Sequence, residues 1–161
     1  MTAVISDTNI LIDYIVSNKY ILSVSCEKLY KFIIPTPIFK EIKQLPQEEA
    51  INLGMEIYEP SLKQVIEANQ RDGKLSFYDK LCFVVARDKK CICATNDKVL
   101  KNYCTNNNVD TIWGLEIMLR LYENNFLEKK TAVETARDIH KSNKLITKEV
   151  LETFIAKINK L

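Results

Sequence analysis

AVISDTN at residues 3–9 and CICATND at residues 91–97 share one construction, and together they decide the fold. In each stretch a short apolar run stops at a carboxylate, Asp7 in the first and Asp97 in the second, with Thr and Asn beside it. Each run is typical of a buried strand that delivers an acid to the edge of a sheet, with a helix starting directly afterwards. Because ligands of open α/β sheets bind beyond the carboxyl ends of the strands, two acids at that edge predict a site for a hard cation.

Short apolar runs alternate five times with helical segments along the chain. Strands are expected near residues 4–5, 31–34, 56–58, 91–94 and 109–113, and helices near 9–15, 37–44, 61–71, 76–88 and 97–104. Continuous apolar strands that alternate with helices are typical of a parallel sheet with both faces covered. We therefore expect an α/β fold, followed by amphipathic helices from residue 114 onward that pack on the same domain.

The composition is that of an ordinary globular protein of one domain, with 161 residues and a formal net charge of +2. This near-neutral charge neither requires nor excludes a nucleic-acid partner. Five cysteines without a C-x-x-C pair are expected to be reduced thiols in a cytoplasmic protein. The sequence shows no basic leader and no long apolar segment, so neither an export signal nor a membrane span is expected.

Four carboxylates fall near the same predicted edge of the sheet. Asp7 and Asp97 leave parallel strands, whereas Glu41 and Asp79 lie in the first or second turn of helices that start at that edge. Mg²⁺ and Mn²⁺ prefer oxygen ligands and are held by a few carboxylates together with several waters. Because clustered acids raise one another's pKa unless a cation neutralises them, we interpret the four as an acidic pocket that binds Mg²⁺ or Mn²⁺.

Each carboxylate also has a purely structural explanation. Asp7 and Asp97 are good helix N-cap residues, Asp79 follows Ser76 at the spacing of a capping box, and Glu41 fits a solvated helix face. Capping explains each residue separately, but it does not predict that all four share one edge. The conjunction therefore favours a common site.

Four motifs occur in order along the chain: VISDTNIL at residues 4–11, PIFKEI at 37–42, LSFYD at 75–79 and ATND at 94–97. Their order and strand context resemble a PIN domain, and the sequence is most similar to the small prokaryotic PIN proteins that include VapC-type toxins. The resemblance covers roughly residues 2–115. A helical extension over about residues 115–161 makes this chain longer than a compact VapC-type toxin, within a single PIN-like domain.

The resemblance implies a three-layer α/β/α sandwich with a five-stranded parallel sheet, and a metal-dependent endoribonuclease that uses Mg²⁺ or Mn²⁺. It assigns metal binding and catalysis to four carboxylates: Asp7, Glu41, Asp79 and Asp97. Three polar neighbours have side chains suited to supporting the ligands, or to purely structural roles: Thr8, Asn9 and Thr95. The resemblance implies RNA as a partner and, for a toxin of a toxin–antitoxin pair, an antitoxin protein as well. A homodimer is also expected, whereas contact with a membrane is not.

Lysines lie close to the motif acids in sequence and are candidates to meet phosphates, although a solvated surface position is the commoner fate of lysines. They are Lys40, Lys43, Lys74, Lys80, Lys98 and Lys101. His140 is the only histidine, which excludes a ribonuclease with paired histidines and a zinc site built from His and Cys.

Other functions fit the sequence less well. A haloacid-dehalogenase-like phosphatase needs D-x-D after the first strand, but Asn9 takes the place of its second acid. A receiver domain needs an acidic pair where Ser6 and Asp7 offer one acid. A catalytically weak PIN module that binds RNA or a partner remains an alternative, with apolar stripes in residues 115–122 and 150–158 as its contact surfaces; core packing within the chain also explains those stripes.

Overall fold

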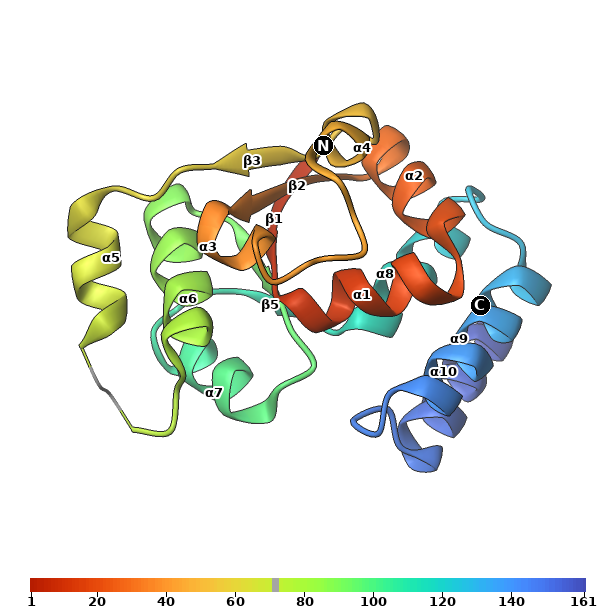
Figure 1. Ribbon diagram of the computed structural model, residues 1–161. Coiled ribbons are helices and arrows are strands. Elements are labelled where there is room, and N and C mark those ends of the chain that lie inside the picture. The colour runs from red at the N-terminus through yellow and green to blue at the C-terminus, as the bar shows by residue number, and fades with distance from the viewer. Residues whose placement is uncertain (71–72) are drawn as a thin grey trace.

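A five-stranded, all-parallel sheet forms the centre of the molecule in the computed structural model, which describes residues 1–70 and 73–161 (Figure 1). Its strands are β1 (Thr2–Ser6), β2 (Tyr30–Pro35), β3 (Glu56–Tyr58), β4 (Ile92–Ala94) and β5 (Thr111–Ile112). They lie in the order β3-β2-β1-β4-β5. Helices cover both sides of the sheet, so the predicted α/β/α sandwich is confirmed.

The central strand β1 pairs with β2 on one side and with β4 on the other, with Val4 opposite Phe32 and Ile5 opposite Cys93. These four side chains are almost completely buried, which explains why the strands are continuously apolar. From β1 the chain adds β2 and β3 on one side, then crosses back to β4 on the other. The boundary between β1 and β4 is therefore the switch point of the sheet, where α/β proteins bind their ligands.

Ten helices connect and cover the strands in the described parts of the chain. They are α1 (Thr8–Ser17), α2 (Lys19–Lys28), α3 (Thr36–Phe39), α4 (Gln47–Asn52), α5 (Leu62–Asn69), α6 (Phe77–Lys89), α7 (Lys98–Asn106), α8 (Gly114–Glu123), α9 (Lys129–Ser142) and α10 (Lys148–Lys160). Helices α2 and α4 were not predicted. The first is separated from α1 only by Asn18, whose side chain accepts a hydrogen bond from Tyr20 N at 3.1 Å and so caps the new helix.

The helix predicted over residues 37–44 is wrong, because α3 ends at Phe39 and Glu41 lies in the turn that follows. The backbone N–H groups of Glu41 and Ile42 donate to carbonyls three residues earlier, at 3.0 and 2.9 Å. Ile42 and Leu45 are still buried in the core, at the spacing from Ile38 that one face of a helix would give, so the apolar pattern alone does not reveal that the helix ends. The helix predicted to reach residue 71 ends at Asn69, and residue 71 lies outside the described residues.

The C-terminal helices α9 and α10 pack against α1 and α8. Asn18 Nδ2, at the end of α1, donates to Thr135 Oγ1 of α9 at 3.2 Å. Most residues of the two apolar stripes considered as partner surfaces are buried within the chain: Leu115, Met118, Leu151, Phe154 and Ile158. Leu119 and Tyr122 are half-buried and Val150 is exposed, so packing in the same chain accounts for most, but not all, of the two stripes.

Two expectations from composition concern thiols and membranes. All five cysteines are free, and four of them are buried. Among the described residues, no helix combines the length and apolar character needed to cross a bilayer.

Candidate active site

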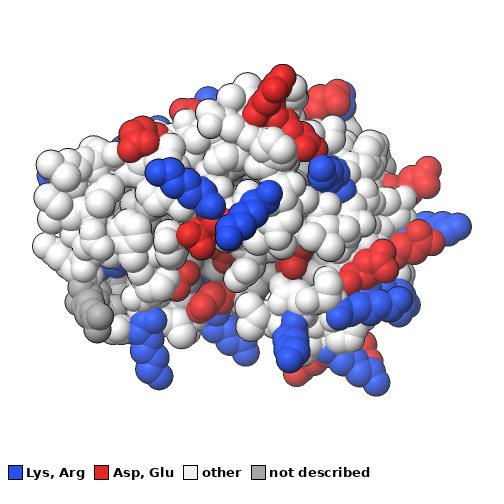
Figure 2. Space-filling model, viewed as in Figure 1, with Lys and Arg blue, Asp and Glu red and all other residues white. Residues whose placement is uncertain are grey.

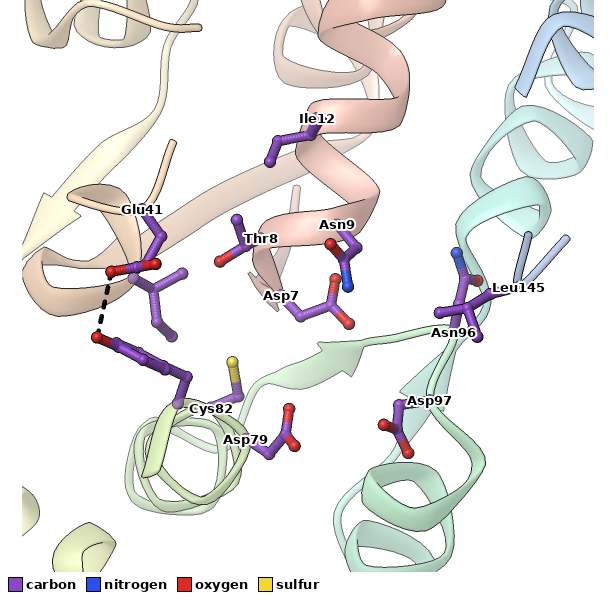
Figure 3. A pocket seen from close by; sticks show the side chains of 12 residues that line it. Asp7, Thr8, Asn9, Ile12, Glu41, Asp79, Cys82, Asn96, Asp97 and Leu145 are labelled. Carbon is purple, nitrogen blue, oxygen red and sulfur yellow. Dashed lines mark hydrogen bonds between the residues drawn. The ribbon is translucent and has the colours of Figure 1, made fainter. Parts of the chain in front are cut away.

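A cavity of about 370 Å³ opens beyond the carboxyl ends of β1 and β4 (Figure 3). All four predicted carboxylates and two of the three predicted supporting residues line it. The lining residues are Asp7, Thr8, Asn9, Ile12, Ile38, Glu41, Tyr78, Asp79, Cys82, Asn96, Asp97 and Leu145. The shared edge expected from the strand ends is therefore a shared pocket.

Asp7 lies at the base of this pocket and is only 9% exposed. One carboxylate oxygen accepts a hydrogen bond from Ile10 N at 3.0 Å and so caps α1, while the other accepts from Thr95 Oγ1 at 2.7 Å. Burial raises the pKa of Asp7, the two hydrogen bonds oppose this shift, and the charges of Asp79 and Asp97 raise the pKa further. Capping and a place in an acidic cluster are thus two properties of the same residue.

Thr95, which is fully buried, links Asp7 to the fourth motif acid. Its hydroxyl donates to Asp7 and accepts a hydrogen bond from Asp97 N at 3.0 Å. Asp97 Oδ1 in turn accepts from Val99 N at 2.7 Å and Leu100 N at 3.2 Å, capping α7. The turn after β4 therefore holds two carboxylates in fixed relative positions.

Asp79 enters the pocket from the first turn of α6, opposite the strand ends. Its backbone N–H donates to Ser76 Oγ at 3.1 Å, as the capping interpretation predicts. Burial raises the pKa of Asp79, and the charge of Asp97 adds to that rise. Figure 3 shows the carboxylates of Asp7, Asp79 and Asp97 directed toward a common space.

Glu41 occupies a different wall of the pocket. Its carboxylate is exposed and accepts a hydrogen bond from the Tyr78 hydroxyl at 3.1 Å, away from the three aspartates (Figure 3). The four acids are therefore three converging aspartates plus one glutamate that lies across the cavity.

The suitability of the pocket for a metal ion depends on its donor atoms. Within residues 1–70 and 73–161, no group of three or more His, Cys, Asp or Glu side chains is placed so that it could hold a metal ion as it stands. The donor set still fits Mg²⁺ or Mn²⁺, because the carboxylates of Asp7, Asp79 and Asp97 face one cavity and neighbouring charges add to the raised pKa of Asp7 and of Asp79. These ions keep several waters and need only one or two direct carboxylates, so the aspartates need not touch.

The candidate phosphate-binding lysines differ in exposure. Lys80 is only 6% exposed and lies 5.5 Å from the centre of the Tyr103 ring, so its predicted role is not supported. Lys40 and Lys43 flank Glu41 and are exposed. Figure 2 shows acidic side chains gathered at the centre of one face, with basic side chains beside them over the segment that follows α3.

Sequence reasoning missed several residues that line or support the pocket. Tyr78 and Asn96 lie inside the quoted motifs, next to the acids, but only the structure shows what they contact. Asn96 Oδ1 accepts a hydrogen bond from Gly114 N at 2.9 Å, which fixes the turn after β4 to the start of α8. A side chain at position 114 would meet the Asn96 amide at 3.1 Å. No sequence motif pointed to Leu145, because this residue lies in the turn between α9 and α10, far beyond the four motifs.

Comparison with known proteins supports the fold. No family model and no curated protein matches the sequence. Among solved structures, a PilT N-terminus domain protein from the hyperthermophilic archaeon Sulfolobus solfataricus P2 is similar, with a TM-score of 0.55 and 18% sequence identity. The match covers 74% of this chain and 92% of that one. PilT N-terminus domains are PIN domains, so the fold of this chain is PIN-like.

Proposed function

We propose that this protein is a metal-dependent endoribonuclease of the PIN type, with the carboxylate pocket as its active site. The observation that carries the proposal is the convergence of Asp7, Asp79 and Asp97 on one cavity at the switch point of the sheet. PIN domains are generally nucleases, and the fold match supports that class of chemistry for this chain.

Asp7, Asp79 and Asp97 would hold Mg²⁺ or Mn²⁺, directly or through water. When bound, the ion lowers the pKa of a nearby water and stabilises the charge that develops on the leaving oxygen of the phosphodiester. Neutralisation of the three charges also removes the mutual repulsion that raises the pKa of Asp7 and Asp79.

The remaining residues position these groups. The Thr95 hydroxyl fixes one Asp7 oxygen and the backbone that carries Asp97, which keeps two ligands oriented before the ion arrives. Thr8 and Asn9 line the same wall. Glu41, whose carboxylate accepts a hydrogen bond from the Tyr78 hydroxyl, lies across the cavity, where it would orient the attacking water or help to hold the ion.

A second candidate is a catalytically weak PIN module that binds RNA. The observation in its favour is that no three of the described acidic, histidine or cysteine side chains are already placed to hold an ion. The two candidates differ in one property, because only the nuclease cleaves RNA when Mg²⁺ or Mn²⁺ is added.

The decisive experiment is cleavage of a labelled single-stranded RNA by the purified protein with Mg²⁺ or Mn²⁺. We expect Asp7→Asn to lower the rate at least about 100-fold, because removal of a direct ligand exceeds the 10–100-fold cost of losing a supporting group. Glu67→Gln, which removes a carboxylate remote from the pocket, serves as the matched control and should cleave like the wild type. Equal cleavage by wild type and Asp7→Asn would contradict the proposal, and hydrolysis of a chromogenic phosphate ester instead of RNA would favour a phosphatase.

The resemblance to VapC-type proteins supports a narrower role as a toxin with an antitoxin partner. In that role, expression of the wild type in the cytoplasm of a bacterial host arrests growth, and Asp7→Asn does not. Normal growth during expression of an enzyme that cleaves RNA in vitro would argue against a toxin while leaving the nuclease intact.

A further inference from the structure

The turn between α9 and α10, residues 143–146, reaches the rim of the carboxylate pocket. Leu145 lines that pocket together with Asp7 and Asn96, and Figure 3 shows it close to Asn96. Its side chain is 55% exposed. An apolar group thus stands at the mouth of an acidic cavity, supplied by the helical extension that lies beyond the four motifs.

The turn is held in place without any help from the Leu145 side chain. Asn143 Nδ2 donates to Asp13 Oδ2 of α1 at 2.8 Å, and Asn143 Oδ1 accepts from Leu145 N at 2.9 Å. His140 Nδ1 lies 2.6 Å from the carbonyl oxygen of Ile146, whose side chain is buried in the core. These contacts anchor the turn to two other elements, so the position of Leu145 is fixed although it remains exposed.

The chemistry around Leu145 fits one class of ligand. Isolated exposed leucines are common on protein surfaces, but this one borders a cavity proposed to act on phosphodiesters. Unpaired RNA bases offer flat faces, which proteins bind mostly by stacking aromatic side chains or arginine on them. A leucine side chain offers a smaller apolar surface to the same faces. Exposed lysines flank the turn, namely Lys141, Lys144 and Lys148, and Figure 2 shows basic side chains over this part of the same face. The turn therefore offers an apolar contact for a base and positive charge for phosphates.

We propose that Leu145 positions the substrate, with single-stranded RNA crossing from the carboxylate pocket over the α9–α10 turn and one of its bases packing on the Leu145 side chain. This inference rests on the proposed function and adds a residue that contacts the strand and the direction in which the strand leaves the site. Duplex RNA is excluded from the contact because its bases are stacked and paired inside the helix.

The test measures binding of a short fluorescein-labelled oligo(U) RNA by fluorescence anisotropy, in an Asp7→Asn background that leaves the strand uncleaved. Leu145→Ser should raise the Kd about fivefold, because about half of a leucine side chain loses its chance of burial. Val150→Ser is the matched control, since Val150 is 41% exposed on α10 and does not line the pocket. Leu145→Phe should bind at least as tightly as leucine does. Thermal unfolding of each variant checks that the fold is retained.

Equal Kd values for Leu145→Ser and Val150→Ser would overturn the inference, as would duplex RNA binding as tightly as oligo(U) with the same dependence on Leu145. A wild-type protein that binds oligo(U) but does not cleave it with Mn²⁺ would end the nuclease proposal, yet the Leu145 effect on Kd would still support the contact. Absence of any RNA binding would overturn both.

Discussion

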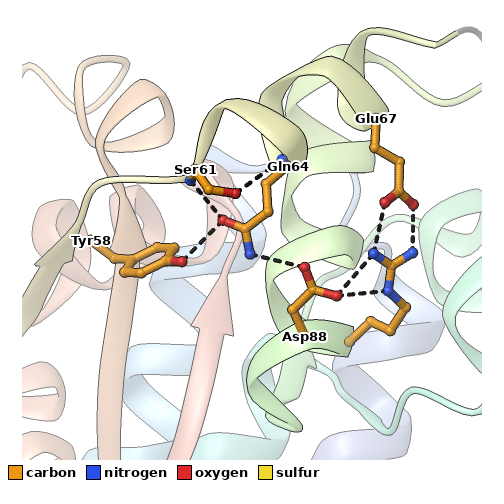
Figure 4. Close-up of polar contacts among 6 residues, drawn as sticks. Tyr58, Ser61, Gln64, Glu67 and Asp88 are labelled. Atoms are coloured by element: carbon orange, nitrogen blue, oxygen red, sulfur yellow. Dashed lines mark hydrogen bonds and ion pairs between the residues drawn. The ribbon is translucent and has the colours of Figure 1, made fainter.

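Two groups of charged side chains in this molecule are built in opposite ways. Between α5 and α6 the charges are paired: the Arg87 guanidinium donates to both oxygens of Glu67 and to Asp88, and Gln64 Nε2 donates to Asp88 at 3.0 Å (Figure 4). The hydrogen bond from Arg87 lowers the pKa of Glu67. In the pocket, burial and neighbouring carboxylates raise the pKa of Asp7. The first group pairs opposite charges and so stabilises the fold. The second brings like charges together, and a bound cation would reduce their repulsion.

The difference shows how a structural and a functional set of acids can be separated within one chain. A paired network satisfies its own charges and gains nothing from an added cation. Converging aspartates repel one another and cost stability unless a cation neutralises them.

The largest effect is expected on cleavage. Asp97→Asn should lower kcat at least about 100-fold, because it removes a ligand while asparagine still caps α7 as well as aspartate does. Asp88→Asn makes the same chemical change in the paired network and should leave kcat unchanged. Single-turnover cleavage of labelled RNA measures both. Similar losses in the two variants would mean that the pocket has no special role.

The next effect is a gain in stability from metal. At 100 times its Kd, Mn²⁺ should raise the free energy of unfolding by about 2.7 kcal/mol through mass action. Urea denaturation with and without Mn²⁺ measures this gain. Glu67→Gln should retain the full gain and Asp97→Asn should lose most of it. If the wild type has the same free energy of unfolding with and without Mn²⁺, this result would argue against a metal site.

A smaller effect is expected in the paired network. Gln64 is 6% exposed, and its amide contacts Tyr58, Ser61 and Asp88 at 2.9–3.0 Å. Gln64→Ala should lower the free energy of unfolding by about 1–2 kcal/mol, because it leaves partly buried polar partners unsatisfied. Urea denaturation measures the loss, and the cleavage rate of the folded variant should match the wild type. A large loss of activity would show that the two regions are coupled.

The smallest effect concerns pH. Burial raises the pKa of Asp13 to about 6, and the charge of Asp7 adds to the rise. The native state therefore holds this proton more tightly than the unfolded chain does, and stability falls as pH rises between about 4 and 6. Asp13→Asn removes that fall, so the variant should be more stable than the wild type at pH 7.5, with the difference growing between about pH 4 and 6. At pH 4 the two should differ little, and a difference that does not change with pH would contradict this assignment.

The sequence allowed much of the fold to be predicted for a simple physical reason. Parallel strands end at the same edge of a sheet, so residues that follow two buried runs, such as Asp7 and Asp97, lie at one edge. The pairing of β1 with β4 then makes these two neighbours. Glu41 was placed on a helix because the buried residues Ile38, Ile42 and Leu45 keep a helical spacing, although the backbone after Phe39 forms turns. Leu145 could not be found, because its position depends on the contact between Asn143 and Asp13, which lie far apart in the chain and belong to no motif.

The most direct test is X-ray diffraction at the manganese absorption edge from crystals soaked in Mn²⁺. We predict an anomalous peak in the cavity between the carboxylates of Asp7, Asp79 and Asp97, and no peak there in Asp97→Asn crystals treated in the same way. A wild-type crystal with manganese bound only elsewhere, or with none bound, would contradict the proposed metal centre.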